Sequence, residues 1–278
     1  MLWFFTAIQP EAVPVLKTFS MEREPSLFGT FYRSKEAVLV ISGSGPVSMA
    51  AAAAEALSRF PAGPADIAVN LGICGAPAGY PYAQCYRIHK ITDASSGRDF
   101  YPDLLASSDL PEAALTTCSA PCASPATLTD MEGSAFFETV AKVFSPDRIF
   151  LYKIVSDHGI EAGKAAPFLT PQTVTELIGN AFGGILKEVT AYTALLPEEP
   201  ALSRETEAGA EALCTLLDAS VTMRNDIRKM LLYLQLRDGN AAEAVQRFLL
   251  AEGLDGQKPL RRKEGKLVLE RFRQYCLL

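Results

Sequence analysis

Residues 37–59 read AVLVISGSGPVSMAAAAAEALSR, and the class of fold can be predicted from them. The first six residues are a continuous apolar run of the kind that is buried on both faces of a parallel sheet. The run ends in Gly43, Ser44 and Gly45, and Pro46 then opens an alanine-rich helical stretch. A buried strand followed by a glycine turn and a helix predicts an α/β layered domain.

The same alternation continues on both sides of this stretch. Short apolar runs predict strands at residues 2–8, 66–71, 86–91 and 148–155. Apolar residues at helical spacing predict helices from Pro10 onward, at 132–144 and at 170–196. The sequence therefore predicts an α/β domain over residues 1–196.

The pattern changes after residue 196. A Pro-Glu-Glu-Pro stretch at 197–200 is rich in helix breakers. Beyond it the spacing is helical throughout, and it predicts helices at 205–217, 221–236, 241–252 and 261–275. We therefore expect an all-helical appendage at 201–278.

Charge and composition exclude several classes of protein. The chain has 278 residues, of which 49% are hydrophobic and 21% charged, and its formal net charge is −6, which argues against a nucleic-acid binder with a general basic surface. A basic cluster in the appendage could bind a polyanion, but Glu264 and Glu270 interleave with it, which favours a solvated helix face. The cluster consists of Lys258, Arg261, Arg262, Lys263 and Lys266.

The cellular compartment can be predicted from the start of the chain and from the length of its apolar runs. No apolar run approaches the roughly 18 residues that would cross a bilayer, so we expect no membrane association. The apolar residues 1–8 lack a basic leader and run into Pro10 and Glu11, which predicts a buried strand rather than a signal peptide. These features predict a cytoplasmic protein.

The six cysteines are predicted to be reduced thiols, because the chain shows no export signal. Cys118 and Cys122 lie four residues apart, but neither a second cysteine pair nor a histidine cluster accompanies them, and a metal site needs three or four ligands. The alternative, which we favour, is that they pack as small hydrophobic residues. Only His89 and His158 could supply histidine chemistry, so no metal and no cofactor is expected.

Polar residues and glycines follow several predicted strands, at the sheet edge where ligands gather in open α/β folds. The backbone amides of Gly43 and Gly45 precede a helix and suit an anion or a sugar hydroxyl. This turn is neither a G-x-G-x-x-G fingerprint nor a phosphate loop, so dinucleotide and NTP binding are poorly supported. A second strand end, NLGICGA at 70–76, contains Gly72 and Ile73.

Two acidic residues stand at further element ends. Met131 and Glu132 open a predicted helix, and Ser156 and Asp157 close the next strand. Taken singly, each acid also has a structural interpretation. Glu132 complements the dipole of a helix, and Asp157 caps a turn.

In order and spacing these stretches resemble the nucleoside phosphorylase/nucleosidase superfamily, most closely its 5′-methylthioadenosine/S-adenosylhomocysteine nucleosidase branch. The resemblance covers roughly residues 2–192 and leaves out the helical appendage. It rests on AIQPE at 7–11, SGSGPVSMAAAAA at 42–54, NLGICGA at 70–76, TDMEGSAF at 129–136 and SD at 156–157. The resemblance implies a three-layer α/β/α sandwich, cleavage of a purine-type N-glycosidic bond and a homo-oligomer, most simply a dimer.

The resemblance also assigns roles to residues at matching positions. Asp157 would protonate the leaving base, and Glu11 would orient and deprotonate the attacking water. Bond cleavage builds positive charge on the sugar, so nearby carboxylates stabilise the transition state. Glu132 would hold two ribose hydroxyls and Met131 would pack against the sugar. The remaining residues expected to bind substrate are Ser156, Gly43, Gly45, Gly72 and Ile73.

The choice of nucleophile follows from what faces the sugar. The segment directly after Gly45, Pro46-Val47-Ser48, contains no arginine, and Ile73 stands where the family has a serine, so a buried phosphate would lack donors. Glu11 would also repel phosphate. We therefore expect hydrolysis. The alternatives are a purine nucleoside phosphorylase and a non-catalytic nucleoside-binding scaffold whose appendage contacts a protein partner.

The part of the site that would hold the base differs from the family pattern. The segment at residues 116–130 is much shorter than the base-binding loop of the family. An aromatic ring normally stacks on the purine there. Phe100, Tyr101 and Phe168 are the candidates for this ring, with core packing as the alternative for each.

Overall fold

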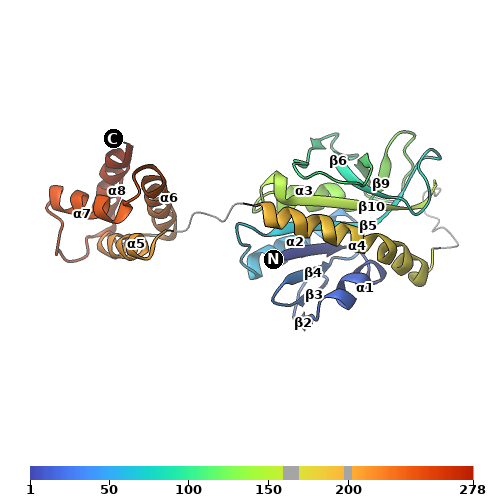
Figure 1. Cartoon of the computed structure of the whole chain (residues 1–278), viewed down its shortest axis with the longest axis horizontal. Coiled ribbons are helices and arrows are strands. Elements are labelled where there is room, and N and C mark those ends of the chain that lie inside the picture. The colour runs from blue at the N-terminus through green and yellow to red at the C-terminus, as the bar shows by residue number, and fades with distance from the viewer. Residues whose placement is uncertain (159–168, 197–201, 278) are drawn as a thin grey trace. The chain divides into compact units, whose positions relative to one another are not determined.

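The computed structural model describes residues 1–158, 169–196 and 202–277 (Figure 1). The chain divides into two compact units, Met1–Pro197 and Glu198–Leu278. The first unit has two hydrophobic clusters and the second has one of its own.

The first unit is built on a mixed sheet of ten strands within the described residues. They are β1 (Leu2–Thr6), β2 (Glu22–Glu24), β3 (Thr30–Arg33), β4 (Ala37–Ile41), β5 (Ile67–Gly75), β6 (Cys85–Asp93), β7 (Asp99–Phe100), β8 (Glu112–Thr117), β9 (Leu128–Asp130) and β10 (Ile149–Asp157). Strand β1 pairs in parallel with β4 and β5, and β5 pairs in parallel with β10. Strands β5, β10, β6, β8 and β9 pair successively into a closed ring.

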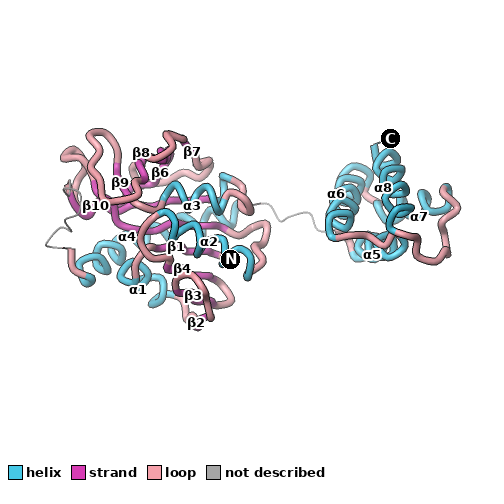
Figure 2. The backbone as a smooth tube through the Cα atoms, turned by 180° about the vertical axis from the view of Figure 1, so that it is seen from behind, coloured by secondary structure: helices cyan, strands magenta, loops and turns pink. Residues whose placement is uncertain are grey.

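Helices cover both faces of this sheet and make a three-layer α/β/α sandwich, as predicted. Helices α2 (Pro46–Arg59) and α3 (Gly133–Val140) pack on one face, and α1 (Gln9–Thr18) and α4 (Pro171–Leu195) on the other. Strand alternation sorts the side chains, because Trp3 and Phe5 join one cluster and Phe4 joins the other. Figure 1 shows α4 in front of the strands. Figure 2, the view from behind, shows α2 and α3 in front of them.

Two helices begin close to the carboxyl ends of neighbouring strands. Strand β1 ends at Thr6 and α1 begins at Gln9, while β4 ends at Ile41 and α2 begins at Pro46. Gly45 caps α2 with φ of 98°, in the region that favours glycine. Because β1, β4, β5 and β10 are parallel neighbours, the polar residues at their carboxyl ends meet at one edge of the sheet.

The structure corrects one prediction about the cysteines. A disulfide joins Cys118 and Cys122, which we expected to be reduced and buried. Both lie in the turn between β8 and β9, which brings the two half-buried side chains together. The remaining four cysteines are free and buried.

Several short elements were not predicted. Strands β2 and β3 lie at the edge of the sheet and are rich in polar residues, so they lack a buried apolar run. The predicted helix at 132–144 ends earlier, at Val140, and is followed by a turn. The breaker-rich stretch at 197–200 and Phe168 lie outside the described residues.

The second unit is helical throughout its described residues. It consists of α5 (Arg204–Leu216), α6 (Val221–Asp238), α7 (Ala241–Ala251) and α8 (Arg262–Leu277). Ser203, Ser220 and Asn240 cap the first three by accepting a hydrogen bond from a backbone N–H of the first turn. Searched over the described residues, neither unit contains a helix of the length and hydropathy that spanning a membrane requires.

Candidate functional site

A cavity of about 200 Å³ lies at the carboxyl ends of β5 and β10 in the first unit. Glu11, Glu132 and Asp157 all line it, although they come from α1, the start of α3 and the end of β10. All three are buried. Residues that are far apart in the sequence therefore meet around one small hollow.

Three backbone N–H groups hold the carboxylate of Glu11 in place. Its Oε2 accepts hydrogen bonds from the N–H of Ala7 (2.9 Å) and Ile8 (3.1 Å), and Oε1 accepts one from Ile73 (3.0 Å). Burial raises the pKa of Glu11, while these hydrogen bonds and the charge of Lys153 oppose the rise. Glu11 is thus a fixed and desolvated carboxyl group.

Gly72 allows this carboxylate to lie against β5. A Cβ at this position would come within 2.9 Å of Oε1 of Glu11 and 3.5 Å of Nζ of Lys153. Real Cβ atoms do not approach an oxygen so closely without displacing it. Gly72 does not itself line the cavity, but its missing side chain leaves the space that Glu11 occupies.

Lys153 is a buried cation among acids, and the sequence analysis did not identify it. It is 1% exposed, and its Nζ lies 2.8 Å from Oδ2 of Asp130. Burial alone would lower the pKa of Lys153, but the charges of Asp130, Glu132 and Glu11 raise it. A lysine in the middle of an otherwise apolar strand was the pattern that could have revealed it.

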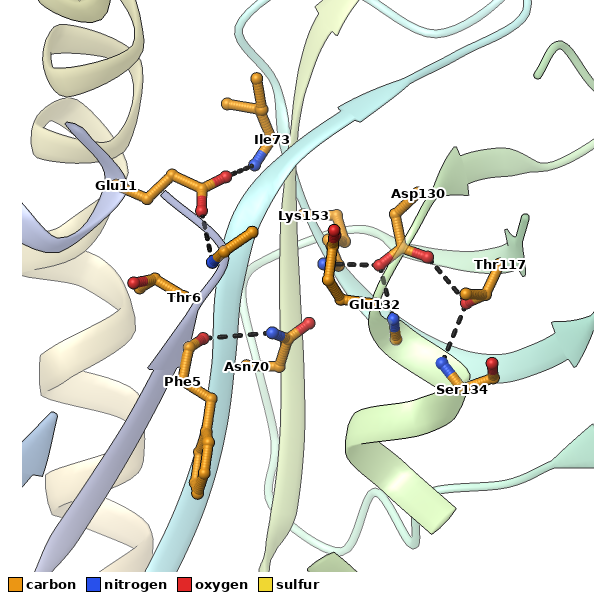
Figure 3. Close-up of polar contacts among 12 residues, drawn as sticks. Phe5, Thr6, Glu11, Asn70, Ile73, Thr117, Asp130, Glu132, Ser134 and Lys153 are labelled. Carbon is orange, nitrogen blue, oxygen red and sulfur yellow. Dashed lines mark hydrogen bonds and ion pairs between the residues drawn. The ribbon is translucent and has the colours of Figure 1, made fainter. Parts of the chain in front are cut away.

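Asp130 connects Lys153 to β8 and to α3, as Figure 3 shows. Its Oδ1 accepts a hydrogen bond from the hydroxyl of Thr117 (2.7 Å), and its Oδ2 accepts one from the N–H of Gly133 (2.8 Å). The hydroxyl of Thr117 in turn accepts one from the N–H of Ser134 (2.9 Å). This network fixes the first turn of α3 and with it the position of Glu132.

Glu132 lies against the beginning of α2. The N–H of Gly45 donates a 2.7 Å hydrogen bond to Oε1 of Glu132. Burial, followed by the charge of Asp130, raises the pKa of Glu132 to about 7, while Lys153 and the Gly45 N–H act in the opposite direction. The carboxyl group is therefore poised to change its protonation state near neutral pH.

Asp157 ends β10 and is oriented by its neighbour. The hydroxyl of Ser156 lies 2.9 Å from Oδ2 of Asp157 and 3.1 Å from the carbonyl oxygen of Cys74. A Cβ on Gly75 would lie 3.3 Å from Oδ1 of Asp157, so the glycine lets β5 approach the acid closely. The Nε2 of His158, the next residue, lies 2.5 Å from the carbonyl oxygen of Tyr80.

The other predicted binding residues divide into two groups. Met131, Ser156 and Ile73 line the cavity. Gly43, Gly45 and Gly72 do not, although Gly45 and Gly72 contact Glu132 and Glu11. The backbone N–H of Ile73 also donates a hydrogen bond to Oε1 of Glu11.

Two of the aromatic candidates for the base-stacking ring lie elsewhere. Phe100 packs against Phe137, and Tyr101 is exposed near Lys90. Among the described residues, no aromatic side chain lines the cavity. The same residues contain no group of three or more His, Cys, Asp or Glu side chains with the geometry of a metal site.

Solved structures with the same fold include several nucleosidases. The 5′-methylthioadenosine/S-adenosylhomocysteine nucleosidase (MTAN) of Colwellia psychrerythraea, solved with adenine, is 18% identical, with a TM-score of 0.55 over 68% of this chain and 94% of that one. The 5′-methylthioadenosine nucleosidase of Arabidopsis thaliana is also 18% identical, with a TM-score of 0.55 over 69% and 95%. The MTAN of Chlamydia trachomatis is 21% identical, with a TM-score of 0.52 over 67% and 96%.

These comparisons show the fold. The likeness spans about two thirds of this chain and nearly all of each nucleosidase. Neither models of protein families nor the sequences of curated proteins match this chain. The α/β unit therefore has the fold of the MTA/SAH nucleosidases, as the sequence motifs predicted.

Proposed function

We propose that this protein hydrolyses the N-glycosidic bond of a purine-type nucleoside. The observation that carries the proposal is the convergence of Glu11, Glu132 and Asp157 on one cavity at the carboxyl edge of the sheet. Cleavage of this bond leaves positive charge on the sugar and negative charge on the departing base. An acid beside the base and carboxylates beside the sugar therefore lower the barrier.

In this proposal Asp157 donates a proton to the leaving base, and Ser156 orients its carboxyl group. Glu132 accepts hydrogen bonds from ribose hydroxyls, and its negative charge stabilises the oxocarbenium-like sugar. Met131 packs against the sugar from the cavity wall. Each of these groups touches the cavity directly.

Glu11 is the proposed base for the attacking water. A carboxylate offers about four lone-pair sites, and three backbone N–H groups already occupy three of them. The remaining site, on Oε1, can accept a proton from water. The raised pKa of Glu11 makes the carboxylate a stronger base than an exposed glutamate.

Water is favoured over phosphate by the charges around the cavity. The ionised carboxylate of Glu11 lines it, and its negative charge would repel a phosphate dianion. The beginning of α2, where an anion would otherwise bind, already donates its Gly45 N–H to Glu132. Both features support hydrolysis over phosphorolysis.

Part of the cavity wall is apolar, and this suggests the kind of nucleoside. Ile8, Met131 and Leu169 contribute side chains without polar hydrogens. An alkylthio group at the 5′ position would bury apolar surface against such a wall. The substrate class we propose is therefore that of methylthioadenosine and adenosylhomocysteine.

The test is incubation with methylthioadenosine, adenosylhomocysteine, adenosine and inosine, with and without inorganic phosphate, followed by chromatography. We expect free base and free sugar at rates that phosphate does not increase. A sugar 1-phosphate that forms only when phosphate is added would identify a phosphorylase instead. Release of no base from any of these nucleosides would contradict the proposal.

A further inference from the structure

The disulfide between Cys118 and Cys122 closes a turn that forms part of the cavity wall. Pro121 and Cys122 line the same cavity as Glu132 and Asp157. The turn follows directly after β8, whose last residue, Thr117, donates a hydrogen bond to Asp130. A covalent bond therefore lies beside the acids of the proposed active site.

Few other interactions hold this turn in place. The N–H of Cys118 donates to the carbonyl oxygen of Asp130 (2.8 Å), and the hydroxyl of Thr129 donates to the carbonyl oxygen of Cys122 (3.1 Å). Among the described residues, these are the hydrogen bonds that join residues 118–122 to the rest of the unit. Because Thr129 and Asp130 also line the cavity, a movement of the turn is transmitted to its wall.

The two paired cysteines are also the ones that solvent can reach. Both are half-buried, and the residues between them, Ser119, Ala120 and Pro121, are exposed. Cys74 and Cys85, the other cysteines of this unit, are buried, and burial raises the pKa of the Cys85 thiol to about 12. Thiol exchange requires a thiolate and access to sulfur, so a reductant or oxidant in solution acts on the Cys118–Cys122 pair first.

We propose that Cys118 and Cys122 form a redox modification site that controls ligand binding in the adjoining cavity. The oxidised form holds Pro121 and Cys122 against the cavity, and the reduced form releases the turn and weakens binding. The inference rests on the proposed nucleoside-binding function of that cavity. It adds to that function a form of regulation, in which the thiol–disulfide balance of the surrounding solution changes the affinity for ligand.

The chemistry needs only a small thiol as co-reactant. Its thiolate attacks one sulfur of the disulfide, forms a mixed disulfide and releases the other sulfur as a thiolate, which takes up a proton. A second molecule of the thiol attacks the mixed disulfide and releases the second protein thiol. The protein gains two electrons and two protons, and the two small thiols are oxidised to their disulfide.

The test compares oxidised and reduced full-length protein by two measurements. Calorimetric titration with adenine measures ligand binding, and amide hydrogen exchange of residues 115–130 measures the mobility of the wall without any ligand. The matched control is the double variant Cys118→Ser/Cys122→Ser, which cannot form the bond. A Cys85→Ser variant checks that a buried thiol outside the pair has no part in the response.

We expect reduction to weaken adenine binding at least fivefold and to speed exchange at residues 118–130. The double variant should bind as weakly as the reduced protein and should not respond to the reductant. Equal exchange in the two redox states would overturn the proposal, as would a double variant that still responds. If adenine binds equally well to both forms, the proposed control of binding fails even where exchange differs. If no base is released from any nucleoside but reduction still changes adenine binding and exchange, the proposed function fails while the redox control of the cavity stands.

Discussion

The backbone N–H of Gly45 donates a 2.7 Å hydrogen bond to Oε1 of Glu132, a residue 87 positions later in the chain. This bond joins the glycine turn before α2 to the start of α3. It directs the partial positive charge at the beginning of α2 toward a carboxylate of the protein itself. The same contact holds Glu132, the proposed sugar-binding residue, at the cavity.

The first prediction concerns the pH dependence of folding. The pKa of Glu132 is about 7 in the folded protein, against a usual value of 4.5, so the folded state keeps this proton where the unfolded chain loses it. The free energy of unfolding should therefore fall as pH rises from about 4.5 to 7, by on the order of 3 kcal/mol from this group. Glu132→Gln should remove that part of the fall.

Urea unfolding of both proteins between pH 4.5 and 8 measures the difference, in which the contributions of all other groups largely cancel. The glutamine oxygen can still accept the hydrogen bond from Gly45. If the two stability profiles run parallel over this range, Glu132 does not titrate as described.

The second prediction concerns the buried ion pair between Lys153 and Asp130. Lys153→Met removes the cation and leaves the carboxylate of Asp130 buried without its counter-charge. Breaking one partner of such a pair costs about 3–5 kcal/mol. We expect a loss of unfolding free energy of this size in denaturant titration.

The double variant Lys153→Met/Asp130→Asn is the control, because it removes both charges. It should be more stable than Lys153→Met alone. A single variant within about 1 kcal/mol of the wild type would show that Lys153 is not needed to balance Asp130.

The third prediction concerns the space that Gly72 leaves for Glu11. Gly72→Ala places a Cβ 2.9 Å from Oε1 of Glu11 and must move the carboxylate. A displaced base loses its alignment with the attacking water, so we expect kcat for base release to fall at least about tenfold. Gly79→Ala is the matched control, because its Cβ would meet no atom within 4 Å. Equal rates for the two variants would show that Glu11 does not need its present position.

The fourth prediction concerns the helical unit. A Cβ on Gly265 of α8 would clash with the carbonyl oxygen of Leu217, and backbone cannot yield as a flexible side chain does. Gly265→Ala should therefore destabilise this unit. Gly209→Ala, in α5, meets only ordinary contacts near 3.9 Å and should stabilise its helix by up to about 1 kcal/mol. Thermal unfolding of the full chain, followed by far-UV circular dichroism, should show that the two variants shift the midpoint temperature of this unit in opposite directions.

Elements with a strong local pattern were predicted well. Helix α2 spans Pro46–Arg59, as its apolar spacing and the preceding glycine turn indicated. The four helices of the second unit also lie close to their predicted positions. Edge strands β2 and β3 were missed because pairing with a neighbour, rather than a buried apolar run, holds them in the sheet.

The site was predictable only in part, for a related reason. Glu11, Glu132 and Asp157 stand at element ends, where sequence motifs drew attention to them. Two of their partners, the N–H groups of Ile73 and Gly45, are distant backbone groups that leave no trace in a local pattern. The disulfide was missed because we predicted the state of the cysteines from the expected cellular compartment. The sequence does not show that the β8–β9 turn brings Cys118 and Cys122 together.

The most direct test of the central claim is base release from methylthioadenosine in phosphate-free buffer by the wild type, Asp157→Asn and Glu11→Gln. The wild type should release free purine base and free sugar in equal amounts. Each variant should fold normally and lose at least about a hundredfold in rate, because it lacks the proton donor or the base. Variants as active as the wild type, or a wild type that releases no base, would contradict the assignment of these acids.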